Sequence, residues 1–229
     1  MSYPEWYMYE SLYAKYQQRS VSELIDFAGN VKGKCVLDLC GGTGRLAEEC
    51  AKRDASEITV VDASKDMTRR ISVEPYLLLR VRVCNRDVSD FLKGHFKCWF
   101  TRVGPDFVFC RQAVNYWFDK ESESHLARHL KTGALFVFNT FNTIPREEPH
   151  FTQYTFPDDN GVDREFTEVV VFDKTTNMIH HMQAREGLPM HATSFKWISP
   201  DQFDELLRDH FDFTVKIDGR ASLYRCVRK

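Results

Sequence analysis

The chain has 229 residues, a formal net charge of −2 and a pI of about 6.4, and 43% of its residues are hydrophobic. These values are typical of one ordinary globular domain, and they exclude disordered, collagen-like and heptad-dominated architectures. The 31 basic side chains are fewer than the 33 acidic ones. A dedicated nucleic-acid binder needs a basic surplus to neutralise phosphates, so we expect no nucleic-acid partner.

The seven cysteines are odd in number, include no Cys-x-x-Cys pair, and lie partly within apolar runs. They indicate small buried side chains in a reducing compartment, without a disulfide framework or a metal site. The N-terminus lacks a basic-then-apolar signal, and no run approaches the ~20 apolar residues that cross a bilayer. We therefore expect a cytoplasmic protein that does not bind membranes.

Aromatic residues crowd a helical stretch that we predict to end near Gly29 and Asn30. An aromatic stripe at helical spacing usually packs against a core. Here most of these side chains carry phenol hydroxyls, which suits a lid over a polar pocket. The sequence therefore predicts an N-terminal lid over residues 1–30, whose aromatic residues are Tyr3, Trp6, Tyr7, Tyr9, Tyr13 and Tyr16.

Short, almost continuous apolar runs follow, of the kind that central parallel strands show because both of their faces are buried. Helical stretches at 45–53 and 121–131 lie between them, and this alternation predicts a doubly wound parallel sheet. The segment 79–84 alternates arginine with apolar residues, which indicates a strand near the sheet edge. The central strands are predicted at 34–39, 57–62, 105–110 and 134–139.

After Pro145 the pattern changes to an alternation of polar and apolar residues. It predicts an antiparallel hairpin laid over the parallel sheet, within a β-rich cover at 146–195. The period of two puts His180 and His181 on opposite faces, so only one of them can face a pocket. The alternating segments are 151–156, 165–173 and 178–185.

The C-terminal part begins with a helix start, because Ser199, Pro200 and Gln202 match an N-cap, a first helical proline and a capping box. We expect this helix to end near Asp209. Segments 211–217 and 222–227 are joined by a short connection, which predicts an antiparallel pair of strands.

A glycine-rich turn, Gly41-Gly42-Thr43-Gly44, stands between the first strand and the following helix. Glycines there allow positive φ and let a ligand press against bare backbone. Asp38, Asp62 and Asp87 each lie at or just past the end of a successive strand, so they converge on the edge where open α/β sheets bind ligands. Asp62 follows Asp38 by 24 residues, close to the ~20 expected for an acid that binds ribose hydroxyls.

This turn does not read Gly-x-Gly-x-x-Gly, the pattern of dinucleotide-binding folds. In addition, a carboxylate at Asp38 would repel a pyrophosphate. A cationic or zwitterionic ligand is therefore favoured over a dinucleotide.

The segment 36–46 closely resembles the first motif of class I S-adenosyl-L-methionine (SAM)-dependent methyltransferases, and the order of elements agrees over about residues 34–227. The resemblance implies a single α/β domain over residues 1–229. Its sheet would be Rossmann-like, doubly wound and mostly parallel with an antiparallel last strand, beneath an N-terminal helical lid and with the β-hairpin cover inserted after strand five.

The resemblance also implies SAM as the cofactor and assigns residues to it. The glycine turn, with Asp38, Gly42 and Gly44, would border the methionyl part, and Asp62 would bind the ribose. At Cys40 the sequence departs from the family, which most often has glycine there. The remaining assignments are Asp87 to the adenine amino group, Met67 and Val88 to the faces of the base, and Tyr16 and Arg19 to a lid over the SAM carboxylate.

The candidate catalytic residues are Arg111, Tyr116 and Asn139. Arg111 could clamp a carboxylate, although a salt bridge at a strand end would look the same. Tyr116 could line the pocket or belong to a short helix. Asn139 could orient an amine or a carboxylate, although Asn142 and Thr143 after it could simply make a turn before Pro145. The Asn-Pro-Pro-Tyr type of motif found in DNA methyltransferases is missing at 111–117, which argues against methylation of bases.

We therefore expect methyl transfer to a nitrogen or oxygen of a small polar metabolite, by in-line displacement at the sulfonium methyl. Two alternatives stay open. One is an enzyme that cyclises the aminobutyl chain of SAM and releases methylthioadenosine, and the other is a catalytically silent SAM-binding module. The oligomeric state also stays open.

Overall fold

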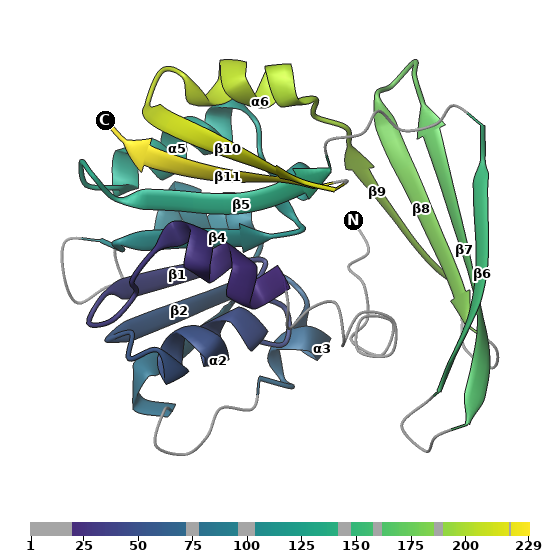
Figure 1. Cartoon of the computed structure of the whole chain (residues 1–229), viewed down its shortest axis with the longest axis horizontal. Helices are drawn as coiled ribbons and strands as arrows, with labels where there is room; N and C mark the ends of the chain where they lie inside the picture. Colours follow the sequence, from purple (N-terminus) through teal and green to yellow (C-terminus); the bar gives the residue numbers. More distant parts are fainter. Residues whose placement is uncertain are drawn as a thin grey trace.

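The computed structural model describes residues 20–71, 78–95, 104–141, 148–157, 162–185, 190–219 and 221–229. These residues form two sheets, a seven-stranded one flanked by helices and a four-stranded one beside it (Figure 1). Within the described ranges, no helix has the length and hydrophobicity that a bilayer crossing requires.

The seven-stranded sheet has the order β10-β11-β5-β4-β1-β2-β3. Neighbours β3, β2, β1, β4 and β5 pair in parallel, whereas β11 pairs antiparallel with both β5 and β10. This confirms a doubly wound, mostly parallel sheet with an antiparallel last strand. The strands are β1 (Cys35–Leu39), β2 (Glu57–Asp62), β3 (Val81–Asn85), β4 (Phe107–Arg111), β5 (Leu135–Phe141), β10 (Phe211–Asp218) and β11 (Ala221–Arg228).

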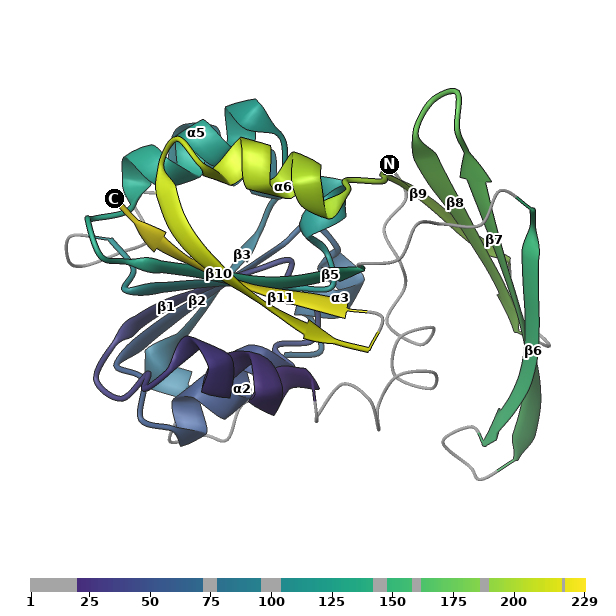
Figure 2. The same cartoon turned by 45° about the horizontal axis from the view of Figure 1, so that its top comes forward.

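Helices cover both faces of this sheet, with α5 and α6 on one side and α2 on the other (Figure 2). A helix at 20–28 packs on the same side as α2 and ends before Gly29, which has a φ of 114°. The helices are α2 (Arg45–Lys52), α3 (Lys65–Thr68), α4 (Val88–Asp90), α5 (Lys120–His129) and α6 (Pro200–Leu207), with short turns η1 (Leu78–Arg80), η2 (Phe91–His95) and η4 (Val114–Tyr116). At α6 the predicted capping box is present, since Ser199 Oγ accepts from Gln202 N at 3.3 Å and Gln202 Oε1 accepts from Ser199 N at 3.0 Å.

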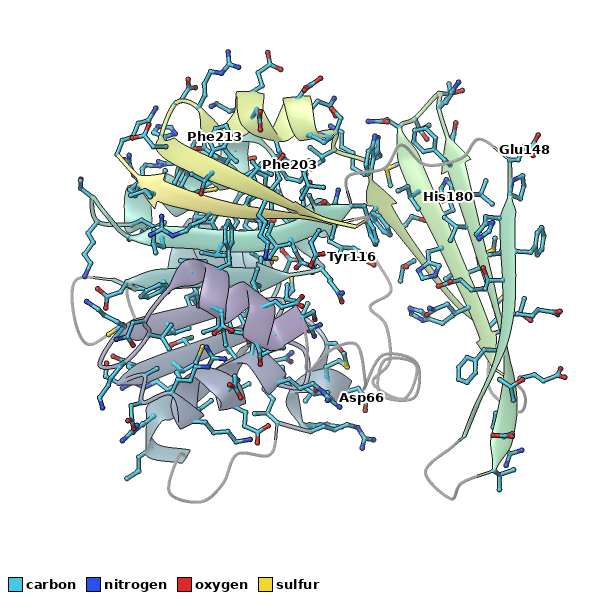
Figure 3. The ribbon with its side chains drawn as sticks, in the orientation of Figure 1. Asp66, Tyr116, Glu148, His180, Phe203 and Phe213 are labelled. Carbon is cyan, nitrogen blue, oxygen red and sulfur yellow. The ribbon has the colours of Figure 1, made fainter. Side chains whose placement is uncertain are left out.

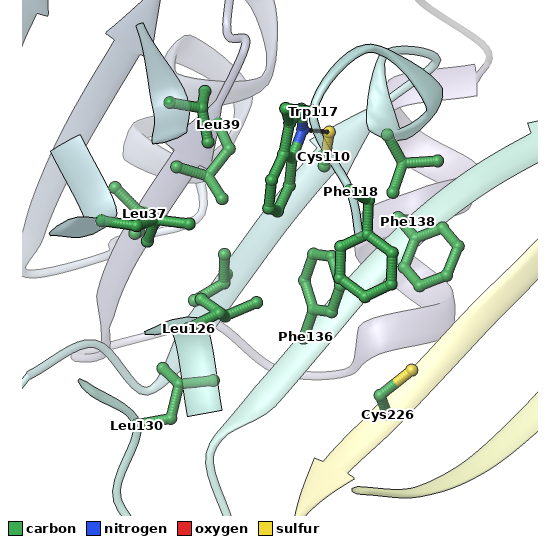
Figure 4. Close-up of a cluster of buried hydrophobic side chains, with 14 of the residues drawn as sticks. Leu37, Leu39, Cys110, Trp117, Phe118, Leu126, Leu130, Phe136, Phe138 and Cys226 are labelled. Atoms are coloured by element: carbon green, nitrogen blue, oxygen red, sulfur yellow. Dashed lines mark hydrogen bonds between the residues drawn. The ribbon is translucent and has the colours of Figure 1, made fainter. Parts of the chain in front are cut away.

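The core is split by the sheet into two clusters, because successive strand residues point to opposite faces. In β5, Phe136 and Phe138 belong to the cluster under α5 and α6, and Val137 to the cluster under α2. In the first cluster the indole Nε1 of Trp117 donates to Cys110 Sγ at 3.4 Å (Figure 4). The near-continuous apolar runs of the sequence thus mark strands that are buried on both faces.

The four-stranded sheet has the order β6-β7-β8-β9, and every neighbouring pair is antiparallel. The sequence analysis predicted a hairpin in this region, whereas the structure has a four-stranded sheet. The segment 191–196 was missed because it carries only one large apolar side chain, Phe195. The strands are β6 (His150–Pro157), β7 (Asp163–Asp173), β8 (Met178–Arg185) and β9 (His191–Lys196).

The placement of this second sheet also differs from the expectation. It does not lie over a face of the parallel sheet but stands opposite the carboxyl ends of the parallel strands (Figures 1 and 2). The turn η4 joins the two sheets, because the rings of Tyr116 and Phe195 lie 5.0 Å apart and Asn115 Nδ2 donates to the carbonyl of Lys196 at 3.2 Å. The second sheet thus faces the edge at which the candidate site residues lie.

Candidate active site

The glycine turn connects β1 to α2 through residues with positive φ. Gly42 has a φ of 56°, and Gly44, the N-cap of α2, has a φ of 79°. Only glycine adopts this region without steric cost. Cys40 has a φ of 54° although it carries a side chain, which costs about 1–2 kcal/mol. This is the position at which the sequence departs from the motif it resembles.

Gly41 is a site residue that the sequence analysis did not assign. A Cβ added there would lie 2.6 Å from Val60 Cγ1 and 2.7 Å from Asp38 Oδ2. No side chain fits in this space, so the turn closes directly over the Asp38 carboxylate. The sequence signal for this role of Gly41 was its position next to Gly42 in the motif.

Asp38 is a buried carboxyl group inside β1, with 1% of its surface exposed. Among the described residues, its Oδ2 has no hydrogen-bond partner. Burial raises the pKa of Asp38 to about 7, although the nearby Arg111 guanidinium acts to lower it. A buried oxygen without a donor points to a ligand that brings a cation or a hydrogen-bond donor.

Asp62 ends β2, and both of its oxygens contact backbone amides. Oδ2 accepts from Gly42 N and Oδ1 from Ser64 N, each at 2.8 Å. Burial raises the pKa of Asp62, and these two hydrogen bonds oppose the shift. A carboxylate has about four acceptor positions, so it can still accept from two hydroxyls. Met67 lies over the turn, since its Cε is 3.3 Å from a Cβ added at Gly42.

Asp87 and Val88 follow β3, as predicted. Asp87 is the N-cap of α4, and its Oδ1 accepts from Ser89 N at 2.8 Å. Val88 is 4% exposed and belongs to the hydrophobic core. Their assignment to the adenine of SAM stays a prediction.

Arg111 is the last residue of β4, and its register partner in the neighbouring strand β5 is Asn139, two residues before that strand ends. Arg111 Nη1 donates to Ser20 Oγ at 3.3 Å, which links β4 to the helix at 20–28. Asn139 Oδ1 accepts from Gln112 N at 2.8 Å, and Gln112 has a φ of 58°. Asn139 therefore supports a strained turn directly after Arg111.

Tyr116 lies between the parallel sheet and the four-stranded sheet (Figure 3). Burial raises the pKa of its phenol, a hydrogen bond with Thr193 opposes the shift, and the nearby Cys40 adds to it. Tyr116 thus connects the glycine turn to β9. Tyr16 and Arg19, the predicted lid residues, lie outside the described residues.

The face of the four-stranded sheet that packs against Tyr116, called here the inner face, carries Val170, Phe172, Ile179 and Phe195. Because residues alternate along a strand, Glu168 and His181 share this face. His180 lies on the opposite face, where its Nδ1 is 2.8 Å from Ser194 Oγ. The period-two prediction is thus confirmed, and His181 is the histidine of that pair that faces the site.

A family model described as a methyltransferase domain matches residues 13–215. The chain belongs to the methyltransferase domain family. Among curated protein sequences, none is similar enough to match this methyltransferase.

Solved structures agree in fold with the methyltransferase. SAM-bound CalS10, an amino pentose methyltransferase from Micromonospora echinaspora involved in calicheamicin biosynthesis, is 15% identical, with a TM-score of 0.70 over 100% of this chain and 99% of that one. The sugar N-methyltransferase KedS8 from Streptoalloteichus is 17% identical, with a TM-score of 0.60 over 94% and 86%. A SAM-dependent methyltransferase from Clostridium acetobutylicum is 15% identical, with a TM-score of 0.67 over 96% of both chains.

Members of this family take SAM as their methyl donor, and the residues present fit it. SAM carries an ammonium group, a sulfonium group and ribose hydroxyls. The unpartnered Oδ2 of Asp38 and the two remaining acceptor positions of Asp62 suit such cations and donors. Without side chains at Gly41, Gly42 and Gly44, the backbone of the turn can itself contact a ligand closely.

Proposed function

We propose that the methyltransferase transfers the methyl group of SAM to a nitrogen or oxygen of a small polar molecule. The observation that carries this proposal is the buried Asp38 Oδ2 beneath the glycine turn, which has no hydrogen-bond partner among the described residues. Glu168 and His181, the polar residues of the inner face, support a polar acceptor, as do similar structures that are named as methyltransferases of an amino pentose and of sugars.

In this proposal each residue holds or positions a group. When bound, SAM supplies an electrophilic methyl on a sulfonium sulfur. Asp62 accepts from ribose hydroxyls, and Asp38, kept partly ionised by Arg111, faces the positive charge. Asn139 holds the turn directly after Arg111, whose guanidinium donates to Ser20 Oγ and can also bind a carboxylate. The main contribution of the chain is alignment, because in-line displacement needs the acceptor ~3 Å from the methyl carbon with water excluded.

The compartment is part of the proposal. The six cysteines that the structure describes are free thiols, and five of them are buried. This pattern is typical of a reducing compartment, so we place the enzyme in the cytoplasm. The acceptor would then be an intracellular metabolite.

Mass spectrometry with trideuteromethyl-SAM tests the function. Incubated with a deproteinised metabolite extract, the enzyme should add a labelled methyl group to a small molecule and release S-adenosylhomocysteine. Incubated with SAM alone, it should release no methylthioadenosine. Methylthioadenosine without an acceptor would replace the proposal with cyclisation of SAM. Tight SAM binding in calorimetry with no labelled product would instead indicate a silent binding module.

A further inference from the structure

The inner face carries a polar cluster next to its apolar patch. The register puts Val170, His181 and Thr193 in one row across β7, β8 and β9, and Glu168, Gln183 and His191 in the next row. The apolar row of Phe172, Ile179 and Phe195 lies on the other side. The polar rows therefore begin beside Tyr116, which is hydrogen-bonded to Thr193 of the first row.

Glu168 and His181 form a close pair within this cluster. His181 Nε2 lies 2.5 Å from Glu168 Oε1, and Gln183 Nε2 donates to the same oxygen at 3.3 Å. The two side chains are 20% and 21% exposed, so each is largely buried yet reachable. Among the described residues, the second ring nitrogen of His181, Nδ1, has no hydrogen-bond partner.

Two contacts relate this pair to the glycine turn. Thr193, the register partner of His181, is hydrogen-bonded to Tyr116, and Tyr116 packs against the same hydrophobic core cluster as Cys40 of the turn. Cys40 directly follows β1, which carries Asp38. The Glu168–His181 pair thus faces the carboxyl edge of the parallel strands. It lies on β7 and β8, next to β9, the strand that Tyr116 contacts.

We propose that Glu168 and His181 receive the methyl acceptor as a protonated amine, which makes the acceptor atom a nitrogen. This inference rests on the proposed function and narrows it. The Glu168 carboxylate attracts the ammonium group and orients the imidazole through Nε2. His181 Nδ1 then accepts one proton. A carboxylate that fixes one ring nitrogen leaves the other available as a base, and imidazole exchanges protons near neutral pH.

The step balances in atoms and charge. The proton moves from the ammonium nitrogen to His181 Nδ1, which leaves an electron pair on nitrogen. This pair forms the new N–C bond, and the pair of the C–S bond stays on sulfur. The products are a methylated ammonium ion, S-adenosylhomocysteine and an imidazolium that returns its proton to water.

Incubation of the enzyme with trideuteromethyl-SAM tests the inference. The acceptors are supplied as a metabolite extract supplemented with amino sugars, amino alcohols and their hydroxyl counterparts. We expect the label on nitrogen. Glu168→Gln and His181→Gln should each lower product formation at pH 7 by about 10²-fold or more, the usual contribution of a positioned base. Both variants should keep the SAM affinity of the wild type, because Glu168 and His181 lie in β7 and β8 and not in the glycine turn.

Two matched controls separate this role from the stability of the sheet. His180→Gln alters the neighbouring residue on the opposite face of β8 and breaks its contact with Ser194. His210→Gln breaks another histidine–glutamate pair, in which His210 Nδ1 lies 2.9 Å from Oε1 of the buried Glu123. Both should methylate like the wild type.

The dependence of the methylation rate on pH distinguishes a role of His181 as a base from a purely structural role. The titratable groups on this face near His181 are Glu168, His191 of β9, His150 of β6 and Tyr116. Without His181, only amine that has already lost its proton can react. The rate of His181→Gln should therefore rise about tenfold per pH unit toward the pKa of the amine and approach the wild-type rate.

Each outcome decides one question. Labelled product with the label on oxygen, or equal rates for the wild type, Glu168→Gln and His181→Gln, overturns the inference but leaves the proposed function intact. No labelled product from any variant, the wild type included, contradicts the proposed function itself. A His181→Gln variant that is slow to the same degree at every pH contradicts the role of its imidazole as a base.

Discussion

The carboxylate of Asp62 accepts a hydrogen bond from the backbone amide of Gly42 at 2.8 Å, so the end of β2 is tied to the glycine turn that follows β1. This hydrogen bond holds the end of β2 and the glycine turn, which we propose to bind different parts of SAM, at a fixed spacing.

Asp62→Ala should weaken SAM binding by ~1–3 kcal/mol, because the ribose hydroxyls lose an acceptor and the turn loses its tie. Isothermal titration calorimetry measures this change. Asp66→Ala, a few residues later in α3 at a position where the side chain is 45% exposed, is the matched control and should bind SAM normally (Figure 3). Equal affinities of Asp62→Ala and the wild type would refute the ribose assignment.

Gly41→Ala should lower both stability and SAM affinity, since its Cβ would lie 2.6 Å from Val60 Cγ1 and 2.7 Å from Asp38 Oδ2. We expect a loss of ~1–3 kcal/mol in the free energy of unfolding, the usual cost of overpacking. Denaturant unfolding measures this loss. At Gly94 an added Cβ meets nothing within 4 Å, so Gly94→Ala should leave both quantities unchanged. A Gly41→Ala variant as stable as Gly94→Ala would show that the turn relaxes.

Asp38 should make stability and SAM binding depend on pH in opposite directions. Its folded-state pKa of about 7 lies above its ordinary value of 3.8, so the folded chain holds this proton more tightly than the unfolded chain. The ligand-free protein therefore loses stability as the pH rises from about 4 to 7, by roughly 4 kcal/mol in total. SAM affinity should rise over the same window, because the anion is the form that faces a cation.

The variant Asp38→Asn isolates this carboxyl group. Its melting temperature should exceed that of the wild type by a smaller margin near pH 5 than near pH 8, while its SAM affinity should be low at both. Differential scanning fluorimetry at the two pH values measures the melting temperatures. A difference in melting temperature that stays the same at pH 5 and pH 8 would argue against the raised pKa.

Asn139→Ala should slow methyl transfer more than it lowers stability. Its amide oxygen accepts from Gln112 N at 2.8 Å, and without it the strained turn after Arg111 can shift. We expect ~0.5–1.5 kcal/mol less stability but about 10²-fold slower single-turnover transfer, because small displacements of positioning groups are costly. Asn139→Asp keeps an acceptor oxygen and should be much less affected. Equal rates of both variants would place the function of Asn139 in its amide nitrogen instead.

Local sequence patterns predicted the parts of the fold that depend on neighbours along the chain. The apolar runs of β1, β2, β4 and β5 marked strands buried on both faces, and Ser199 with Gln202 marked the start of α6. The strand β9 was missed, because its pattern is too polar to distinguish it from a loop. Its place in the sheet depends on pairing with β8.

For this protein, the sequence by itself determined the parallel core, the glycine turn and the acids at the strand ends, since each is encoded by contiguous residues with a local physical preference. Only the tertiary structure decided that Gly41 closes over Asp38, that Asn139 supports the turn at Gln112, and that His181 rather than His180 faces the site. These relationships join residues that are distant in the chain. They depend on strand register and on how the second sheet meets Tyr116, and no local pattern specifies either.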